Sequence, residues 1–357
     1  MRRTAPRAIG LFGALGLLAG LVACSDGGDA STTSTPDESA APTTVADTTT
    51  TEAATTTSTI PAPPQRPQTI DELLNLGRPI VLAHTGGEDQ YPGSTLFGFS
   101  ESVEAGVDML DLNVLLTADG VLVVQHDDTV DRTTNGSGAL ADLTYDEVNA
   151  LDAAYWFTAD CGVCDDQSAE AYIYRGIRTG DQPAPEGYSP DDFAIPSFRD
   201  LVSRFPDLPL NVEIKGEGQA ALAAAQVLAT ELVELDRVDA SVVTSFDDAT
   251  VAALRELMPT VEISPSLGPT SDWVLNGIPL PDGMTILQIP PVFGDIVVIT
   301  PELIANSLAA GYVIWVWPNN RDLENYDTYL SYLESGITGL NINFPDEAVR
   351  ALNDFTA

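Results

Sequence analysis

The chain has 357 residues, of which 53 are acidic and 15 are basic, and its formal net charge is -38 at pH 7. A charge this negative argues against nucleic acid and anionic lipid headgroups as direct partners, because their phosphates would be repelled. Lys215 is the single lysine, and His84 and His126 are the only two histidines, so these three rare side chains can each be followed individually.

The N-terminus has the features of an export signal. A basic start, MRRTAPR, precedes an apolar run at 9–22, and small residues then lead to Cys24. The apolar run is too short for a comfortable transmembrane helix. The stretch LVAC resembles the lipobox of bacterial lipoproteins, whereas LVA alone would suit ordinary signal peptidase. We expect a signal peptide at 1–23 and a lipidated Cys24 that anchors the protein on the outer face of a bacterial cell membrane.

A low-complexity segment follows Cys24. Residues 25–66 consist largely of Thr, Ser, Ala, Pro and Asp and lack the apolar surface that a core requires. We therefore expect a disordered tether at 24–66, which includes the lipidated cysteine. The remaining residues, 67–357, are enough for one large domain.

Nine short β-rich runs alternate with helical patterns in this domain. They lie at 79–84, 108–116, 121–126, 210–215, 240–246, 261–267, 284–290, 312–317 and 339–344. Strands that alternate with helices indicate a parallel sheet, and this number of units favours a (β/α)8 TIM barrel. Only Ala118, Asp119 and Gly120 separate strand-like patterns in LLTADGVLVV, which is typical of a hairpin. Removing one hairpin limb leaves eight barrel strands.

One segment, at about 153–195, interrupts this alternation. It is rich in aromatic, Gly, Pro and Asp residues, and an insertion of this size in a compact barrel is usually functional, often as a lid or a wall of the site. It contains Cys161 and Cys164, which in an exported protein suggest a disulfide. Metal binding or redox chemistry is the alternative for this pair, although no second pair and no neighbouring histidine supports a zinc site.

Polar side chains gather where the predicted strands end. His84 ends the first strand, Asp111 and Asn113 lie late in the second, and Glu213 and Lys215 end the strand at 210–215. Members of each pair are two residues apart and therefore project from one side of their strand. The carboxyl ends of barrel strands meet at one face, where catalytic residues gather, so we expect these side chains to share a site.

An ordered series of motifs resembles the glycerophosphodiester phosphodiesterase family. The family pattern runs H-R-G, P-E-N-T, E-x-D, T-x-D-G, H-D, R-T-T, I-E-x-K, S-F and V-W-T-x-N. Matching stretches occur here in the same order over most of 79–346. They are HTG at 84–86, PGST at 92–95, GVDMLDLNV at 106–114, TADGVLVVQHD at 117–127, RTTNGSG at 132–138, VEIK at 212–215, SF at 245–246 and VWPNN at 316–320.

The resemblance implies a role for each matching residue. It makes His84 and His126 a general acid and base pair, because proton transfer to a leaving alkoxide suits a histidine at neutral pH. The metal ligands that it implies are Asp111, Asn113 and Glu213, whose oxygens suit Ca²⁺ or Mg²⁺. It also implies that Lys215 binds phosphate. Trp317 is either a wall for the glycerol moiety or a core residue.

The chain also departs from the family pattern. Thr85 replaces the arginine after the first histidine, and Gly93 replaces the glutamate of P-E-N-T. Asp111 and Asn113 replace the glutamate and aspartate of E-x-D, and Asn343 replaces a late aspartate. Losing the arginine removes a bidentate phosphate clamp, and an asparagine ligand lowers the charge of the metal site by one.

The resulting hypothesis is metal-dependent hydrolysis of glycerophosphodiesters, or related phosphodiesters, to an alcohol and glycerol phosphate. One alternative is a barrel that has lost turnover and binds a phosphorylated ligand at the cell surface. Another is a lyase-type phosphodiesterase acting on phospholipid headgroups, which would release a cyclic phosphate.

Overall fold

The computed structural model describes residues 66–357. The expected signal peptide, Cys24 and the tether up to residue 65 lie outside these residues. The described part belongs to one compact unit, Ala62–Ala357. Within residues 66–357, every helix is too short or too polar to cross a membrane.

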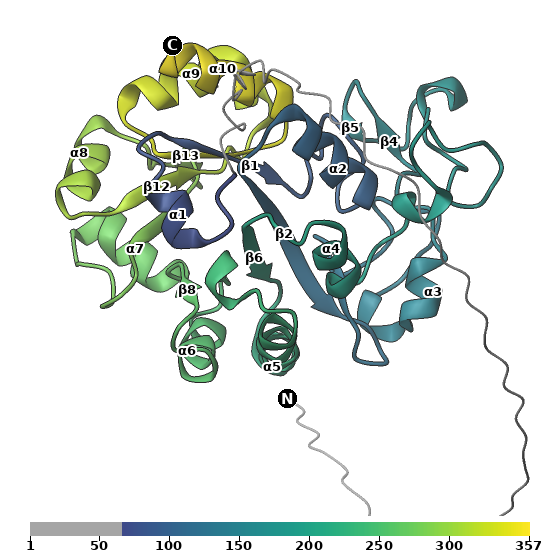
Figure 1. Ribbon diagram of the computed structural model, residues 1–357, viewed down its shortest axis with the longest axis horizontal. Coiled ribbons are helices and arrows are strands. Elements are labelled where there is room, and N and C mark those ends of the chain that lie inside the picture. The colour runs from purple at the N-terminus through teal and green to yellow at the C-terminus, as the bar shows by residue number, and fades with distance from the viewer. Residues whose placement is uncertain (1–65) are drawn as a thin grey trace, which may run out of the picture. The chain divides into compact units, whose positions relative to one another are not determined.

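Eight parallel strands form the central sheet, in the order β8, β7, β6, β2, β1, β13, β12, β9. Their bounds are β1 (Ile80–His84), β2 (Met109–Leu116), β6 (Leu210–Ile214), β7 (Ser241–Thr244), β8 (Glu262–Ile263), β9 (Ile286–Ile289), β12 (Val313–Val316) and β13 (Gly339–Ile342). A helix follows each strand and packs outside the sheet, so that the helices form an outer ring in Figure 1. The predicted (β/α)8 TIM barrel is therefore confirmed, in a nearly closed form.

Eight helices make up the outer ring. They are α2 (Leu96–Ala105), α4 (Phe198–Arg204), α5 (Gly218–Glu234), α6 (Asp248–Leu257), α7 (Leu267–Asn276), α8 (Pro301–Ala309), α9 (Tyr326–Ser335) and α10 (Pro345–Thr356). Five of the eight, α2, α4, α6, α8 and α9, begin at a side-chain cap. Thr95, Asp247 and Asn325, for example, each accept a hydrogen bond from a backbone N–H in the first turn of their helix.

The barrel seam lies between β8 and β9, which share no backbone ladder. Ser264, the residue after β8, bridges the seam by donating a hydrogen bond from Oγ to the carbonyl of Ile286 at 2.9 Å. The seam lies opposite β1 and β2 in the strand order, so the two halves of the barrel mouth are built differently.

The predicted hairpin at 118–120 is present. Strand β3 (Leu122–Val124) pairs antiparallel with β2, with Val114 opposite Val124, and takes no place in the eight-strand order. Because β3 runs back toward the rim, it brings His126 beside the end of β2. There the backbone N–H of Gln125 donates a hydrogen bond to the backbone carbonyl of Asn113 at 2.9 Å.

A short helix closes the N-terminal end of the barrel. Helix α1 (Ile70–Leu74) begins with a capping box between Thr69 and Glu72. Its Ile70 and Leu73 pack against inward-facing side chains from the lower parts of the strands, namely Ile80, Leu82, Met109, Val242, Ile286 and Trp315. This end of the interior is therefore apolar, and the polar interior residues are restricted to the opposite end.

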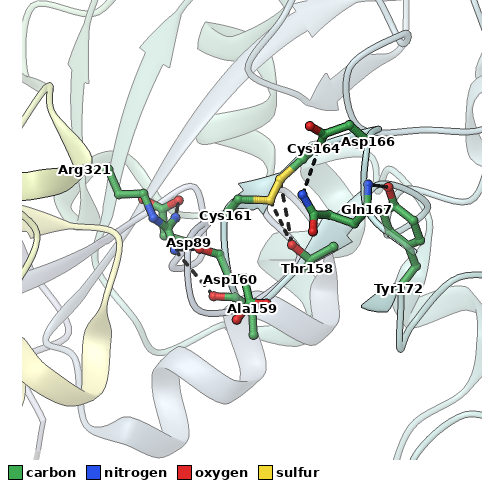
Figure 2. Close-up of a disulfide and its surroundings, with 10 residues drawn as sticks. All are labelled: Asp89, Thr158, Ala159, Asp160, Cys161, Cys164, Asp166, Gln167, Tyr172 and Arg321. Carbon is green, nitrogen blue, oxygen red and sulfur yellow. Dashed lines mark hydrogen bonds and ion pairs between the residues drawn. A yellow bond between two sulfur atoms is a disulfide. The ribbon is translucent and has the colours of Figure 1, made fainter. Parts of the chain in front are cut away.

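The insertion at 153–195 has a small core of its own. It contains the short strands β4 (Phe157–Thr158) and β5 (Gly162–Val163), and lies with helix α3 (Tyr145–Asn149) to one side of the barrel in Figure 1. Phe193 stacks on Phe97 of α2 with ring centroids 4.7 Å apart, which fixes the insertion to the barrel. Cys161 and Cys164 are joined by a disulfide, drawn in Figure 2.

Candidate active site

A cavity of about 550 Å³ opens at the C-terminal ends of the strands. Strand alternation directs polar side chains into it from several strands. The polar lining includes His84, Asp111, His126, Asn211, Glu213, Lys215, Gln288, Asn341 and Asn343. Seven of the residues singled out from the sequence therefore line one cavity, namely both histidines, Asp111, Glu213, Lys215, Trp317 and Asn343. Asn113, the third expected metal ligand, is 1% exposed and lies behind this lining.

The two histidines face one another in this cavity. Their ring centroids lie 6.0 Å apart and their planes meet at 82°. His84 ends β1, whereas His126 arrives on the returning limb of the hairpin. A phosphorus atom with an attacking and a leaving oxygen on opposite sides needs proton-transfer groups on two sides, and a pair at this separation can supply them.

An amide oxygen fixes the orientation of His84. Nδ1 of His84 lies 2.8 Å from Oδ1 of Asn343. Because that oxygen can only accept, Nδ1 carries the proton and Nε2 is the nitrogen left for substrate. Asn343 is oriented in turn by Asp89, whose Oδ2 accepts from Nδ2 of Asn343 at 2.7 Å, and Asp89 forms an ion pair with Arg321.

The charge around His84 favours its protonated form. Burial by itself lowers the pKa of His84, but the negative charges of Glu88 and Asp111 outweigh it, so its pKa lies above the ordinary value. Oε1 of Glu88 is 3.5 Å from Nδ1 of His84. The imidazole is therefore placed to hold or release a proton near neutral pH.

A carboxylate holds His126 in the same way. Nδ1 of His126 lies 2.7 Å from Oδ1 of Asp127, and Arg132 donates from Nε to Oδ2 of Asp127 at 2.5 Å. Burial raises the pKa of Asp127, but these two hydrogen bonds outweigh it and its pKa lies well below the usual range. Asp127 therefore stays ionised, and Nε2 of His126 is again the nitrogen that is left for substrate.

The acidic residues form a second group on β2 and β6. Asp111 is 4% exposed and accepts a hydrogen bond from Asn211. Burial raises the pKa of Asp111, and the nearby His84 opposes the rise only in part. Asn113 is paired with Glu213 in the β2–β6 register, and neither polar atom of its side chain has a hydrogen-bond partner.

The single lysine lies beside this group. Nζ of Lys215 is 2.9 Å from Oε2 of Glu213, and both side chains line the cavity. An ammonium that lines the cavity is a point of attraction for a phosphate oxygen.

Residues 84–347 match the family model described as the Glycerophosphoryl diester phosphodiesterase family. The chain belongs to this family. It is accordingly a phosphoric diester hydrolase, and the family's hydrolysis of glycerophosphodiesters is the activity that this membership supports.

Curated relatives match over most of their length. A glycerophosphodiester phosphodiesterase from Caldanaerobacter subterraneus subsp. tengcongensis is 25% identical over 276 residues, covering 76% of this chain and 96% of the relative. One from Bacillus altitudinis is 25% identical over 273 residues, with 76% and 96% covered.

Solved structures share the fold. A glycerophosphodiester phosphodiesterase from Agrobacterium tumefaciens aligns with a TM-score of 0.55 at 22% identity, covering 76% of this chain and 99% of that one. An Oleispira antarctica phosphodiesterase, solved in complex with the product sn-glycerol-3-phosphate, aligns with a TM-score of 0.55 at 19% identity, covering 77% and 97%.

The structure explains one departure from the family motifs. A Cβ atom at Gly93 would lie 2.7 Å from Cβ of Glu88 and 3.2 Å from Oγ1 of Thr85. A glutamate at position 93 would therefore collide with Glu88. Glu88 itself reaches the cavity, where Oε2 is 3.8 Å from Arg132. A glutamate is thus present at this side of the site, but it comes from a different position of the loop.

The threonine after His84 is turned away from the cavity. Thr85 has a φ of 46°, in the left-handed region that β-branched residues rarely occupy, and its hydroxyl is buried without a partner. Thr85 does not line the cavity, so nothing at this position takes over phosphate binding from the family's arginine.

Several residues of the site were not singled out from the sequence. They include Asn211, Gln288 and Asn341 in the cavity lining, and Glu88, Asp89, Arg321 and Glu324 around His84. Asp89 and Arg321 are 232 positions apart, and no spacing rule pairs them. Glu324 is 6% exposed, accepts a hydrogen bond from the backbone N–H of Asn343 at 3.0 Å and also accepts one from the hydroxyl of Tyr329. Burial raises the pKa of Glu324 to about 7. Only the proximity of Arg321 to the V-W-P-N-N motif signalled that this loop serves the site.

Proposed function

We propose that this protein hydrolyses glycerophosphodiesters to an alcohol and glycerol phosphate by proton transfer through His84 and His126. One histidine takes a proton from the attacking water, or from a substrate hydroxyl if a cyclic intermediate forms, and the other protonates the leaving alkoxide. The observation that carries the proposal is the pairing of the chain's only two histidines across one cavity, each with Nδ1 bound to an oxygen and Nε2 available.

A divalent cation, Ca²⁺ or Mg²⁺, is the cofactor that we propose, held by Asp111, Asn113 and Glu213. In residues 66–357 no three His, Cys, Asp or Glu side chains are grouped to hold a metal ion, so an amide oxygen has to complete the set. The unpartnered Oδ1 of Asn113 fits this role, because burying it without a partner costs free energy that an ion would recover. A bound cation would neutralise charge on the non-bridging phosphate oxygens.

Phosphate binding falls to Lys215 in this proposal, with Trp317 as a wall for the glycerol moiety. Phosphate would compete with Glu213 for the ammonium, which lies 2.9 Å from that carboxylate. The Oleispira relative was solved with sn-glycerol-3-phosphate, and that supports the same product here.

For its location, we propose attachment to the outer face of a bacterial membrane through a lipid on Cys24. A change of Cys24→Ser would then release the protein into the medium and abolish incorporation of labelled palmitate. A Cys24→Ser variant that remains bound to the membrane would contradict the proposed lipid anchor.

A panel of glycerophosphodiesters with Ca²⁺, Mg²⁺ or EDTA tests the proposed function. Wild type is expected to turn over at least one diester with one of the two ions and none with EDTA, and His126→Ala is expected to lose about 10²–10⁴-fold in kcat while keeping the wild-type thermal midpoint. Measurable diester binding without turnover under every condition would favour the ligand-binding alternative. A cyclic phosphate as the final product would favour the lyase.

A further inference from the structure

One half of the catalytic cavity is apolar. Beyond the histidines, the lining is formed by Leu267 and Leu275 of α7, by Phe293 and Ile296, and by Phe246 and Trp317. Phe293 and Ile296 belong to a hairpin of β10 (Val292–Phe293) and β11 (Ile296–Val297) that follows β9. We call these six side chains the apolar wall.

The apolar wall stands across the mouth from the proton-transfer groups. Helix α7 follows β8, and the β10–β11 hairpin follows β9, so both flank the barrel seam. His84 comes from β1, and the histidine beside it is carried on the hairpin of β2 and β3. Since β8 and β9 lie opposite β1 and β2 in the strand order, a substrate whose phosphorus sits between the histidines extends toward the apolar wall.

The wall is unusually open to water for apolar side chains. Leu275 is 58% exposed, Phe293 44% and Ile296 42%. Exposed apolar side chains that lie together and continue a catalytic cavity mark a surface that a ligand covers. Choline, ethanolamine or glycerol alone would leave most of this surface wet, because these alcohols have little hydrocarbon.

The chemistry of the wall favours an aliphatic occupant. Helix α7 carries one charged residue, Asp272, and the turn of the β10–β11 hairpin carries Asp295, so no cation is present in either element. A second anionic group would therefore not be attracted there. A hydrocarbon chain needs no polar partner and gains from every methylene that it buries.

We propose that the apolar wall binds the hydrocarbon chain of a single-chain amphiphilic phosphodiester, of the lysophospholipid kind. This inference rests on the proposed function and names its substrate class. Water would add to phosphorus and lose a proton to one histidine, the bond from phosphorus to the headgroup oxygen would break, and the departing alkoxide would take a proton from the other histidine. The acylated glycerol phosphate would remain with its chain on the wall until release.

A chain-length series tests the proposal. The probes are glycerophosphocholine and lysophosphatidylcholines with hexanoyl, octanoyl and decanoyl chains, all below their micelle concentrations. For wild type, KM is expected to fall with each added methylene, by up to about fourfold where the methylene is fully buried. The double variant Leu275→Gln with Ile296→Gln should flatten this dependence. Leu257→Gln, on α6 and 44% exposed but outside the cavity, is the matched control and should retain it.

Binding separates this inference from the proposed function. The same probes are titrated against His126→Ala, in which turnover is removed. Affinity that rises with chain length supports the apolar wall even if wild type hydrolyses nothing, and in that case only the proposed function fails. If affinity and KM do not change with chain length, or change only with the headgroup, the inference is overturned. Hydrolysis of glycerophosphocholine would in that case leave the proposed function intact.

Discussion

Oδ1 of Asn343 lies 2.8 Å from Nδ1 of His84, although the two residues are 259 positions apart. Parallel pairing of β1 with β13 brings them together, because His84 is the last residue of β1 and Asn343 is the first residue after β13. The contact extends outward through Asp89 to Arg321. The orientation of one histidine therefore depends on a chain of polar contacts that begins at the surface loop of residue 321.

Replacing Asn343 with aspartate is expected to shift the titration of His84. In Asn343→Asp a negative charge contacts Nδ1, and the pKa of His84 rises further, by about one unit or more. The limb of the kcat/KM profile that His84 controls moves to higher pH. Movement of the acid limb identifies His84 as the base, and movement of the alkaline limb identifies it as the acid.

A double variant that also changes Asp89 provides the control for this substitution. Asn343→Asp alone places two carboxylates together, since Oδ2 of Asp89 lies 2.7 Å from the atom that is replaced. Adding Asp89→Asn restores a donor to that contact, so the double variant should recover activity that the single variant loses. Equal activity in the two variants would show that Asp89 does not orient residue 343.

The disulfide loop is expected to affect activity through Asp89. Figure 2 shows the loop beside the Asp89–Arg321 pair, with the carbonyl of Asp160 3.4 Å from Arg321. A Cβ at Gly162 would collide with the carboxylate of Asp89. Gly162→Ala should therefore displace Asp89 and lower kcat, by about tenfold if His84 is misoriented.

A second glycine of the insertion provides the control. Gly180 has a φ of 81°, close to the 73° of Gly162, but a Cβ there meets nothing within 4 Å. Both substitutions carry a similar backbone strain of about 1 kcal/mol. An equal loss of activity in Gly180→Ala would attribute the effect to strain instead of contact with Asp89.

Stability should depend on pH through Glu324. Burial raises its pKa to about 7, above the ordinary value for a glutamate in the unfolded chain. Between these two values the folded state holds the proton that the unfolded state has released, so this group makes the free energy of unfolding fall as pH rises toward 7, and the loss is complete above it. Thermal midpoints of Glu324→Gln, measured from about pH 5 to 8, should therefore decline less than those of wild type.

Glu334 on α9 is exposed and serves as the matched control for this measurement. Glu334→Gln should reproduce the pH dependence of wild type. If Glu324→Gln also declines as steeply as wild type, the buried carboxyl does not titrate in this range.

Restoring a carboxylate at position 113 is expected to tighten metal binding. Asn113→Asp adds a third negative charge to Asp111 and Glu213, and affinity for Ca²⁺ or Mg²⁺ rises with the charge of the ligand set, by about tenfold or more. In EDTA the same variant should be less stable than wild type, by roughly 1–3 kcal/mol, because the added charge is buried without a counter-ion. Calorimetric titration and thermal unfolding with and without metal check both effects, and unchanged affinity would remove residue 113 from the ligand set.

The barrel and much of its site could be predicted from the alternation of strand and helix patterns and from the alternation of side chains along each strand. Alternating strands and helices determined the eight-stranded count, and the three-residue join at 118–120 identified the limb to discard. The spacing of two residues between Glu213 and Lys215 placed both side chains in the cavity. These features are local in the sequence, and the barrel geometry brings the side chains that they place at strand ends close together at one face.

Loop conformation and long-range contact could not be predicted in this way. Glu88 reaches the cavity because the loop after β1 passes through left-handed residues at Thr85, Gly86 and Gly87. Among residues 153–195, none lines the cavity that contains the two histidines, so the insertion is not its wall in this structure. It instead supports the Asp89–Arg321 pair from outside, a contact that depends on how two distant loops fold.

The most direct test of the account is hydrolysis of glycerophosphocholine in oxygen-18 water, followed by phosphorus NMR and mass analysis of the products. Hydrolysis at phosphorus assisted by His84 and His126 predicts glycerol phosphate that carries the label and choline that carries none, with the product greatly reduced in His126→Ala. Label in the choline, a cyclic phosphate as end product, or no conversion by wild type with either Ca²⁺ or Mg²⁺ would contradict it.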